Sequence, residues 1–295
     1  MTDYVTPKEL VREAVDLAAR KADLSVKDML IRGALSGAFL GFATSLVFTV
    51  NSQGLPPVVG AILFPVGFVI LVLLGLELAT GNFAILPVGL FAGNAKLPRL
   101  LRNWMWVYVG NLIGSLLFVA LFCVAITNFR TGNGGPVAEL LKQAALKKTV
   151  GYAALGGSGW GTAFVKAILC NWMVTIGSFM ALVSRSTLGK IAAMWLPSMT
   201  FFALGFEHSI VNMFVIPSGM VLGAPISLAQ FLLWNLVLVT LGNIVAGAFF
   251  TGAALYATYP TAPKHIDLST PATATLATDP QPAFATAPAA TLNPM

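Results

Sequence analysis

Two glutamates in apolar sequence are the first candidates for chemistry. Glu77 and Glu207 each end a Leu-Gly-X-Glu run, in which X is Leu or Phe. His208 follows Glu207 directly, and Thr80 stands three residues after Glu77. An imidazole titrates near neutral pH and can give a proton or a hydrogen bond to an anion, and a nearby hydroxyl can fix its orientation. These residue types indicate the handling of a small anion or a proton.

The two glutamates have two interpretations. Each carboxylate can be a filter residue, or it can accept hydrogen bonds from an interrupted helix and from Asn111 and Asn243. A carboxyl group in apolar surroundings needs such partners, and an anion pathway gains nothing from a bare carboxylate. We therefore favour structural support at both positions. Thr80 also has a second interpretation, as the cap of a short helix that follows it.

The distribution of charge indicates the class of protein. Of 295 residues, 57% are hydrophobic and 9% are charged, which is too few charges to cover a soluble fold. Three stretches carry no charge at all: 33–76, 103–129 and 208–263. Each exceeds the roughly 20 apolar residues that a helix needs to cross a bilayer. The sequence therefore predicts an all-α membrane protein.

Turn signals divide the apolar sequence into six transmembrane helices. We place them at about 33–50, 58–77, 103–128, 163–184, 191–215 and 229–255. The second is interrupted at Thr80–Asn82 and continues towards Gly93, and the fifth is broken around Pro197 and Gly205. A longer polar connection separates the third helix from the fourth.

The flanking segments and the loops predict the orientation. Residues 1–30 are expected to form a cytoplasmic amphipathic helix, 31–256 the six-span domain, and 257–295 a disordered cytoplasmic tail. Twelve Lys and Arg residues fall on the side of the termini and four on the other side. The positive-inside rule then places both termini in the cytoplasm.

An internal repeat relates the two halves of this domain. The run that ends at Glu77 recurs in the run that ends at Glu207. Farther along, Asn103, Gly110 and Asn111 recur with unchanged internal spacing as Asn235, Gly242 and Asn243. Three spans are an odd number, so the second copy must be inverted relative to the first. Inverted repeats with broken helices are typical of transport proteins, whose substrates bind near the breaks.

Four large apolar side chains lie within a few turns of the breaks: Phe64, Phe68, Leu78 and Phe201. They can face lipid and neighbouring helices, or they can form constrictions that exclude hydrated ions. Helical spacing alone leaves both possibilities open.

Other functions find little support in the sequence. No catalytic set, metal-ligand cluster or cofactor motif is present, and no enzyme activity is expected. Cys123 and Cys170 lie in apolar runs and are interpreted as reduced hydrophobic residues. The net charge of +6 is interpreted as basic cytoplasmic loops rather than a nucleic-acid surface.

Three motifs resemble those of the formate–nitrite transporter family: Gly205–Gly219, Cys170–Val174 and Glu77–Asn82. The resemblance covers about residues 6–255. It implies an aquaporin-like homopentamer in a bacterial inner membrane, in which each six-helix protomer has its own pore.

The resemblance also implies residue roles. His208 would be the central pore histidine with Thr80 as its partner, and Asn171 would lie near the pore. The four apolar side chains named above would line two constrictions. Many relatives carry a lysine shortly before the fourth span, but 151–161 contains none. Lys147, Lys148 and Lys166 are the candidates to replace it.

The implied mechanism is passage of formate or nitrite with a proton. An apolar constriction penalises an anion far more than a neutral acid, and the proton can come from His208 or from water. Hydrosulfide, bicarbonate, lactate or acetate in the same fold is the first alternative, and the bulky phenylalanines disfavour the larger of these acids. A membrane sensor without transport is the second alternative, for which an output domain would be expected. The direction of transport stays open.

Overall fold

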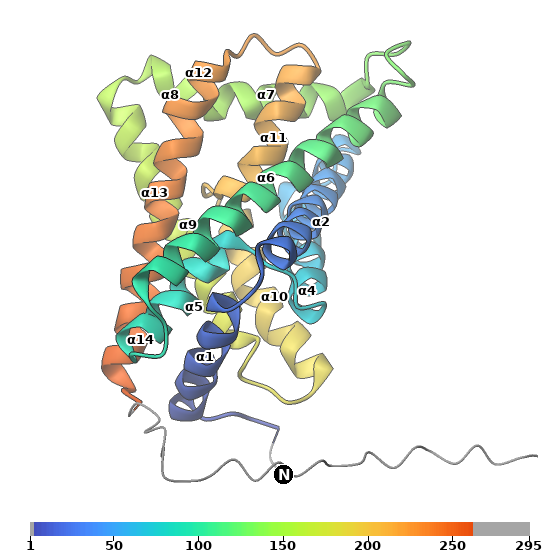
Figure 1. Cartoon of the computed structure of the whole chain (residues 1–295). Coiled ribbons are helices and arrows are strands. Elements are labelled where there is room, and N and C mark those ends of the chain that lie inside the picture. The colour runs from blue at the N-terminus through green and yellow to red at the C-terminus, as the bar shows by residue number, and fades with distance from the viewer. Residues whose placement is uncertain (1–2, 262–295) are drawn as a thin grey trace, which may run out of the picture. The chain divides into compact units, whose positions relative to one another are not determined.

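The computed structural model describes residues 3–261, and these fold into helices joined by short turns (Figure 1). No strand forms in this range, where an isolated β-bridge joins Tyr4 to Ser184. The helical elements are α1 Pro7–Ala22, α2 Val26–Ser52, α3 Pro57–Leu63, α4 Pro65–Leu73, α5 Ala79–Phe91, α6 Leu97–Ile126, α7 Gly135–Lys148, α8 Val150–Ala154, α9 Gly157–Met180, α10 Thr187–Ala203, α11 Ser209–Val221, α12 Leu228–Phe231, η1 Leu232–Leu236, α13 Val237–Val245, η2 Ala246–Ala253 and α14 Ala254–Thr258.

Within residues 3–261, four uninterrupted helical stretches are long and apolar enough to cross a membrane. They are α2, α6, α9 and the continuous run from α12 to α14. Two further apolar stretches are each split in two, namely α3–α4 followed by α5, and α10 followed by α11. Non-helical segments interrupt these stretches at residues 74–78 and 204–208. The second segment agrees with the break expected at Gly205, whereas Pro197 lies inside α10 and does not end it.

Both breaks are built in the same way around a glycine. Gly75 and Gly205 have φ angles of +64° and +66°, which a residue with a Cβ atom rarely adopts. The next residue closes a turn in each case, from the N–H of Leu76 to Leu71 and from that of Phe206 to Phe201. The first interruption was predicted at Thr80–Asn82. That boundary was wrong, because the helix already ends at Leu73 and these residues lie in α5.

Small residues let α2 and α6 approach closely. A Cβ atom on Gly114 would lie 1.7 Å from the backbone oxygen of Ala34, and one on Gly37 would lie 2.1 Å from that of Asn111. Such glycine contacts are a common way for helices to pack in a membrane. This close approach brings the side chain of Asn111 to the first break.

Two shorter helices, α1 and α7, cover the half-helices α5 and α11 (Figure 1). The apolar face of α1 packs on α5, where a Cβ atom on Gly89 would lie 2.5 Å from that of Ala18. The corresponding contact of α7 is between Ala145 and Gly219, at 2.4 Å. Residues 131–161 were predicted only as a polar connection, and α7 was missed. Its buried face consists mostly of small residues, so its apolar pattern is weak.

The N-terminal segment is attached to the loop between α9 and α10. The carboxylate of Asp3 accepts hydrogen bonds from the Ser184 hydroxyl and from the backbone N–H groups of Arg185 and Ser186. The predicted tail, 257–295, begins within α14, and its residues from 262 onward lie outside the described range.

Candidate functional site

An asparagine closes each helix break. Asn111 Oδ1 accepts a hydrogen bond from the N–H of Ala79, and its Nδ2 donates to the carbonyl oxygens of Glu77 and Gly33. These contacts satisfy backbone groups that the interrupted helix leaves without partners.

The second break repeats the arrangement. Asn243 Oδ1 accepts from the N–H of Ser209, and its Nδ2 donates to the carbonyl oxygens of Glu207 and Ala167. The structure therefore brings Asn111 and Asn243 to the two breaks that the repeat predicts.

Thr80 and His208 connect the two breaks directly. The Thr80 hydroxyl oxygen lies 2.9 Å from Nε2 of His208, and both side chains are buried. Thr80 is in the first turn of α5, and His208 is the N-cap of α11. The N-terminal ends of two half-helices therefore meet here. Their partial positive charges favour an anion between them.

The hydrogen bonds define the tautomer of His208. The backbone N–H of Val211 donates to Nδ1 at 3.1 Å, so Nδ1 of the neutral ring carries no hydrogen. The ring hydrogen is then on Nε2 and is donated to Thr80. The hydroxyl hydrogen of Thr80 has no acceptor among residues 3–261. Thr80 is consequently the side chain with a hydrogen to offer.

A closed circuit of four residues, here called the Glu77 ring, supports the first break. Lys21 Nζ donates to Glu77 at 2.6 Å, and Asn82 donates to the second carboxylate oxygen at 2.7 Å. Asn82 also contacts Asn103, which donates to the backbone oxygen of Lys21. The carboxylate is thus neutralised by Lys21 of α1 and held by Asn82 of α5, and Asn103 of α6 closes the circuit.

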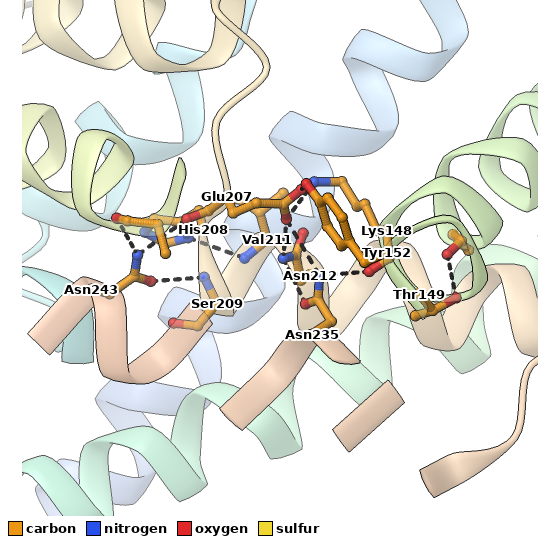
Figure 2. A network of polar contacts seen from close by, with 12 residues as sticks. Lys148, Thr149, Tyr152, Glu207, His208, Ser209, Val211, Asn212, Asn235 and Asn243 are labelled. Atoms are coloured by element: carbon orange, nitrogen blue, oxygen red, sulfur yellow. Dashed lines mark hydrogen bonds and ion pairs between the residues drawn. The ribbon is translucent and has the colours of Figure 1, made fainter. Parts of the chain in front are cut away.

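The Glu207 ring repeats this circuit at the second break (Figure 2). Lys148 and Asn212 donate to the carboxylate of Glu207 at 2.8 and 2.7 Å. Asn212 contacts Asn235, which donates to the backbone oxygen of Lys148. Tyr152 has no counterpart in the other ring, and its hydroxyl donates to Glu207 at 2.8 Å. Burial and the Glu207 carboxylate raise the pKa of Tyr152, which keeps this donor protonated.

Two cavities with basic linings adjoin the breaks. One of about 220 Å³ is lined by His208 together with Lys147, Lys148 and Lys166. The other, of about 510 Å³, is lined by Leu78 at the first break and by four cations, Arg20, Lys21, Arg32 and Lys190. All three lysines considered in the sequence analysis lie at one cavity, and it is Lys148 that pairs with Glu207.

The large apolar side chains are found in two places. Phe201 lines the smaller cavity, stacks on His208 with ring centres 5.8 Å apart and meets Phe64 edge-on at 5.4 Å. Phe202, which sequence reasoning missed, stacks on Phe64 at 4.0 Å. Phe68 and Leu78 instead line the larger cavity. The four predicted side chains are therefore divided between the two sides of the centre.

Asn171 joins the two breaks from α9. Its Nδ2 donates to the backbone oxygen of Thr80 at 3.1 Å and to that of Asn243 at 2.7 Å. Its Oδ1 is buried and has no partner within the described part of the chain. The residue thus contacts Thr80 itself and the asparagine that closes the other break.

Sequence reasoning missed several members of the two rings. Asn82 and Asn212 follow Glu77 and Glu207 at the same short distance along the chain, so the repeat could have identified them. Lys21 and Tyr152 carry no such signal, because neither has an equivalent of the same type at the repeat spacing.

Comparison with known proteins gives a consistent family. A family model described as Formate/nitrite transporter matches residues 8–257. A "Probable formate transporter" of Methanothermobacter thermautotrophicus is 34% identical over 273 residues, covering 88% of this chain and 98% of the relative. The formate channel BtFdhC of Bacillus thuringiensis is 33% identical, covering 86% and 95%.

Two solved structures are similar over most of their length. An "FNT family ion channel" superposes with a TM-score of 0.74 at 27% identity, covering 85% of this chain and 99% of that one. A "Pentameric formate channel with formate bound" gives a TM-score of 0.66 at 25% identity, covering 80% and 98%. These relatives are described as transporters or channels and not as enzymes.

Proposed function

The chain belongs to the formate/nitrite transporter family, and on this basis we propose that it carries formate or nitrite across a bacterial inner membrane. As a member, it is a multi-pass membrane transport protein. The proposed assembly is a homopentamer of protomers with six spans in two inverted halves, each with its own pore and with both termini in the cytoplasm. The similar structure of a pentameric formate channel supports this assembly, and the distribution of Lys and Arg supports the orientation.

The observation that carries the proposal is the contact between Thr80 and His208. It stands where the N-terminal ends of α5 and α11 meet. Both elements offer positive potential, and Thr80 offers a hydroxyl hydrogen without an acceptor among the described residues. A small anion fits such a centre, whereas a cation would meet the wrong sign of charge.

The basic cavities support capture of the anion on both sides. Each lining contains one carboxylate, Glu77 or Glu207, and each of these is already paired with a lysine. The other cations of the linings therefore leave both cavities positively charged. They are Arg20, Arg32 and Lys190 at the larger cavity and Lys147 and Lys166 at the smaller one. Such a field raises the local concentration of anions.

The proton that accompanies the anion is proposed to come from water in the cavities. The neutral imidazole of His208 has one N–H hydrogen, on Nε2, and donates it in a hydrogen bond to the hydroxyl oxygen of Thr80. A second hydrogen on Nδ1 would remove the acceptor for the N–H of Val211 and leave that buried group unpaired. His208 therefore polarises Thr80, and the apolar constrictions favour the neutral acid by disfavouring the charge.

The bulk of the phenylalanine side chains favours the smaller acids. Phe64, Phe201 and Phe202 pack ring against ring beside His208. A small planar anion such as formate or nitrite needs less space than lactate or acetate. Hydrosulfide and bicarbonate are the remaining alternatives within the same fold.

Uptake by purified protein in liposomes tests the proposal. A pH gradient should drive formate and nitrite inward faster than hydrosulfide or bicarbonate. Replacing Thr80 by Val keeps the shape of the side chain but removes its hydroxyl, and uptake should fall at least about tenfold, as when one donor to an anion is lost. Thr44→Val is the matched control, because that buried hydroxyl donates within its own helix. Equal uptake by both variants would contradict the role of Thr80.

A further inference from the structure

The ring edge of Phe68 reaches a glycine on α9. A Cβ atom built on Gly177 would lie 3.3 Å from Cε1 and 3.6 Å from Cζ of Phe68, and 3.3 Å from Cγ of Pro197. Phe68 and Ser178, the residue after Gly177, both line the larger cavity. The missing side chain of Gly177 therefore leaves the space that the end of the phenyl ring uses.

The repeat shows that this space is particular to the second half. Gly33 on α2 and Ala167 on α9 accept the same asparagine hydrogen bond. Gly177 follows Ala167 by the same number of residues as Ala43 follows Gly33, so Gly177 and Ala43 occupy corresponding positions. Ala43 packs on Gly67, whose Cβ position would lie 2.6 Å from its methyl group.

On the helix that packs against each of these positions, the smaller residue is found in the first half instead. Gly67 precedes Gly75, the glycine of the first break, by the same number of residues as Pro197 precedes Gly205, the glycine of the second. Gly67 and Pro197 therefore occupy corresponding positions. The first half therefore has a glycine on α4 facing Ala43, whereas the second half has a proline on α10 facing Gly177. The glycine of the contact thus lies on α4 in the first half and on α9 in the second.

We propose that Gly177 determines the width of the constriction at Phe68 and thereby which small carboxylic acids pass. This inference rests on the proposed transport function and names a specificity-determining residue for it. A methyl group at 177 would be wedged between the ring of Phe68 and the rigid ring of Pro197. At 3.3 Å the neighbour must move by a few tenths of an ångström, and the side of Phe68 that has room is the cavity. The constriction becomes narrower, and larger acids lose more than formate does.

The test compares formate and acetate uptake into liposomes for Gly177→Ala and Gly161→Ala. Both substitutions add the same methyl group to α9 and the same helix propensity, but nothing lies within 4 Å of the Cβ position at Gly161. We expect Gly161→Ala to keep the wild-type ratio of formate to acetate uptake. Gly177→Ala should raise that ratio about tenfold, in the range by which one methylene changes selection in an apolar site.

A second variant keeps the proposal testable if Gly177→Ala assembles poorly. Phe68→Leu lacks the two ring atoms that approach Gly177, so a methyl group at 177 can shift into the space of the lost ring and away from Pro197. Adding Gly177→Ala to Phe68→Leu should therefore impair assembly less than it does in the wild type and leave the uptake ratio unchanged. A methyl group at 177 that impairs the Phe68→Leu protein as much as the wild type would overturn the inference. So would identical ratios for Gly177→Ala and Gly161→Ala in a protein that carries formate. A wild-type protein that carries neither formate nor nitrite would overturn the proposed function itself.

Discussion

Replacement of Glu207 separates a supporting role from a role in the pathway. The carboxylate accepts hydrogen bonds from Lys148, Tyr152, Asn212 and Asn235. In Glu207→Ala all four donors lose this acceptor, and the ammonium group of Lys148, whose side chain is 21% exposed, is left without its counter-charge. The second break should then lose the support that holds α11 against α7.

The size of the effect follows from these contacts. Removing one partner of a buried ion pair costs about 3–5 kcal/mol, and leaving the Tyr152 donor unpaired adds about 1–3 kcal/mol. Even the lower end, about 4 kcal/mol, is a large part of the whole stability of a typical domain, about 5–15 kcal/mol. We therefore expect Glu207→Ala to fail in assembly. Glu207→Gln also removes the counter-charge of Lys148, but it keeps the shape of the side chain and one acceptor oxygen for the ammonium group. It should therefore lose less, about 1.5–3 kcal/mol, and retain much of its uptake.

Two quantities are measured. One is the melting temperature of the purified oligomer, determined by size-exclusion chromatography after heating, and the other is pH-driven formate uptake. Glu139→Ala is the control, because its pair with Lys142 is on the surface, with the glutamate side chain 57% exposed, and should contribute less than about 1 kcal/mol. If Glu207→Ala assembles and melts like the wild type but carries no formate, Glu207 belongs to the pathway and the supporting role is refuted.

Three further predictions concern single groups. His208→Asn should assemble, because asparagine is a good N-cap, and should keep pH-driven uptake within about tenfold; a loss of about 100-fold or more would indicate that the imidazole supplies the proton. Tyr152→Phe removes one of the four donors to Glu207, so it should lower the melting temperature less than Glu207→Ala does and retain uptake. Equal decreases in the melting temperatures of the two variants would contradict this prediction. The hydrogen bond from Ser184 lowers the pKa of Asp3 below its ordinary 3.8. A carboxyl group with a lowered pKa stabilises the folded form fully at pH values above its pKa in the unfolded state, and this stabilisation is lost only as the pH falls through its pKa in the folded state. Amide exchange of residues 3–6, corrected for its intrinsic rate, should therefore be the same from about pH 5 to about pH 8, and detachment of this segment within that range would refute the assignment.

The polar centre could be predicted because its parts are local and repeated. Glu77 and Glu207 stand out as charges in apolar sequence, and Asn111 and Asn243 recur at fixed spacing from their neighbours. The position of the first break was less accurate, since Thr80–Asn82 looks like a turn in sequence. In the structure Gly75 takes the left-handed conformation and ends the helix earlier.

Contacts between distant segments could not be predicted in the same way. Lys21 has several acidic residues nearer in sequence than Glu77, and nothing in its surroundings indicates which one it meets. The division of the aromatic side chains between two cavities depends on how α4 and α10 are rotated. Helical periodicity in a membrane segment does not define that rotation, because lipid-facing and helix-facing residues are both apolar.

The two closed circuits imply an order of assembly during synthesis. Lys21 must wait for Glu77, 56 residues later, and for Asn103, 82 residues later. Lys148 must likewise wait 59 residues for Glu207 and 87 for Asn235. Neither circuit contains a residue of the other, so the first can close while the ribosome is still making the second half. The bond between Thr80 and His208 then joins two pieces of which the first is already complete, and the centre of the molecule is among its last parts to form.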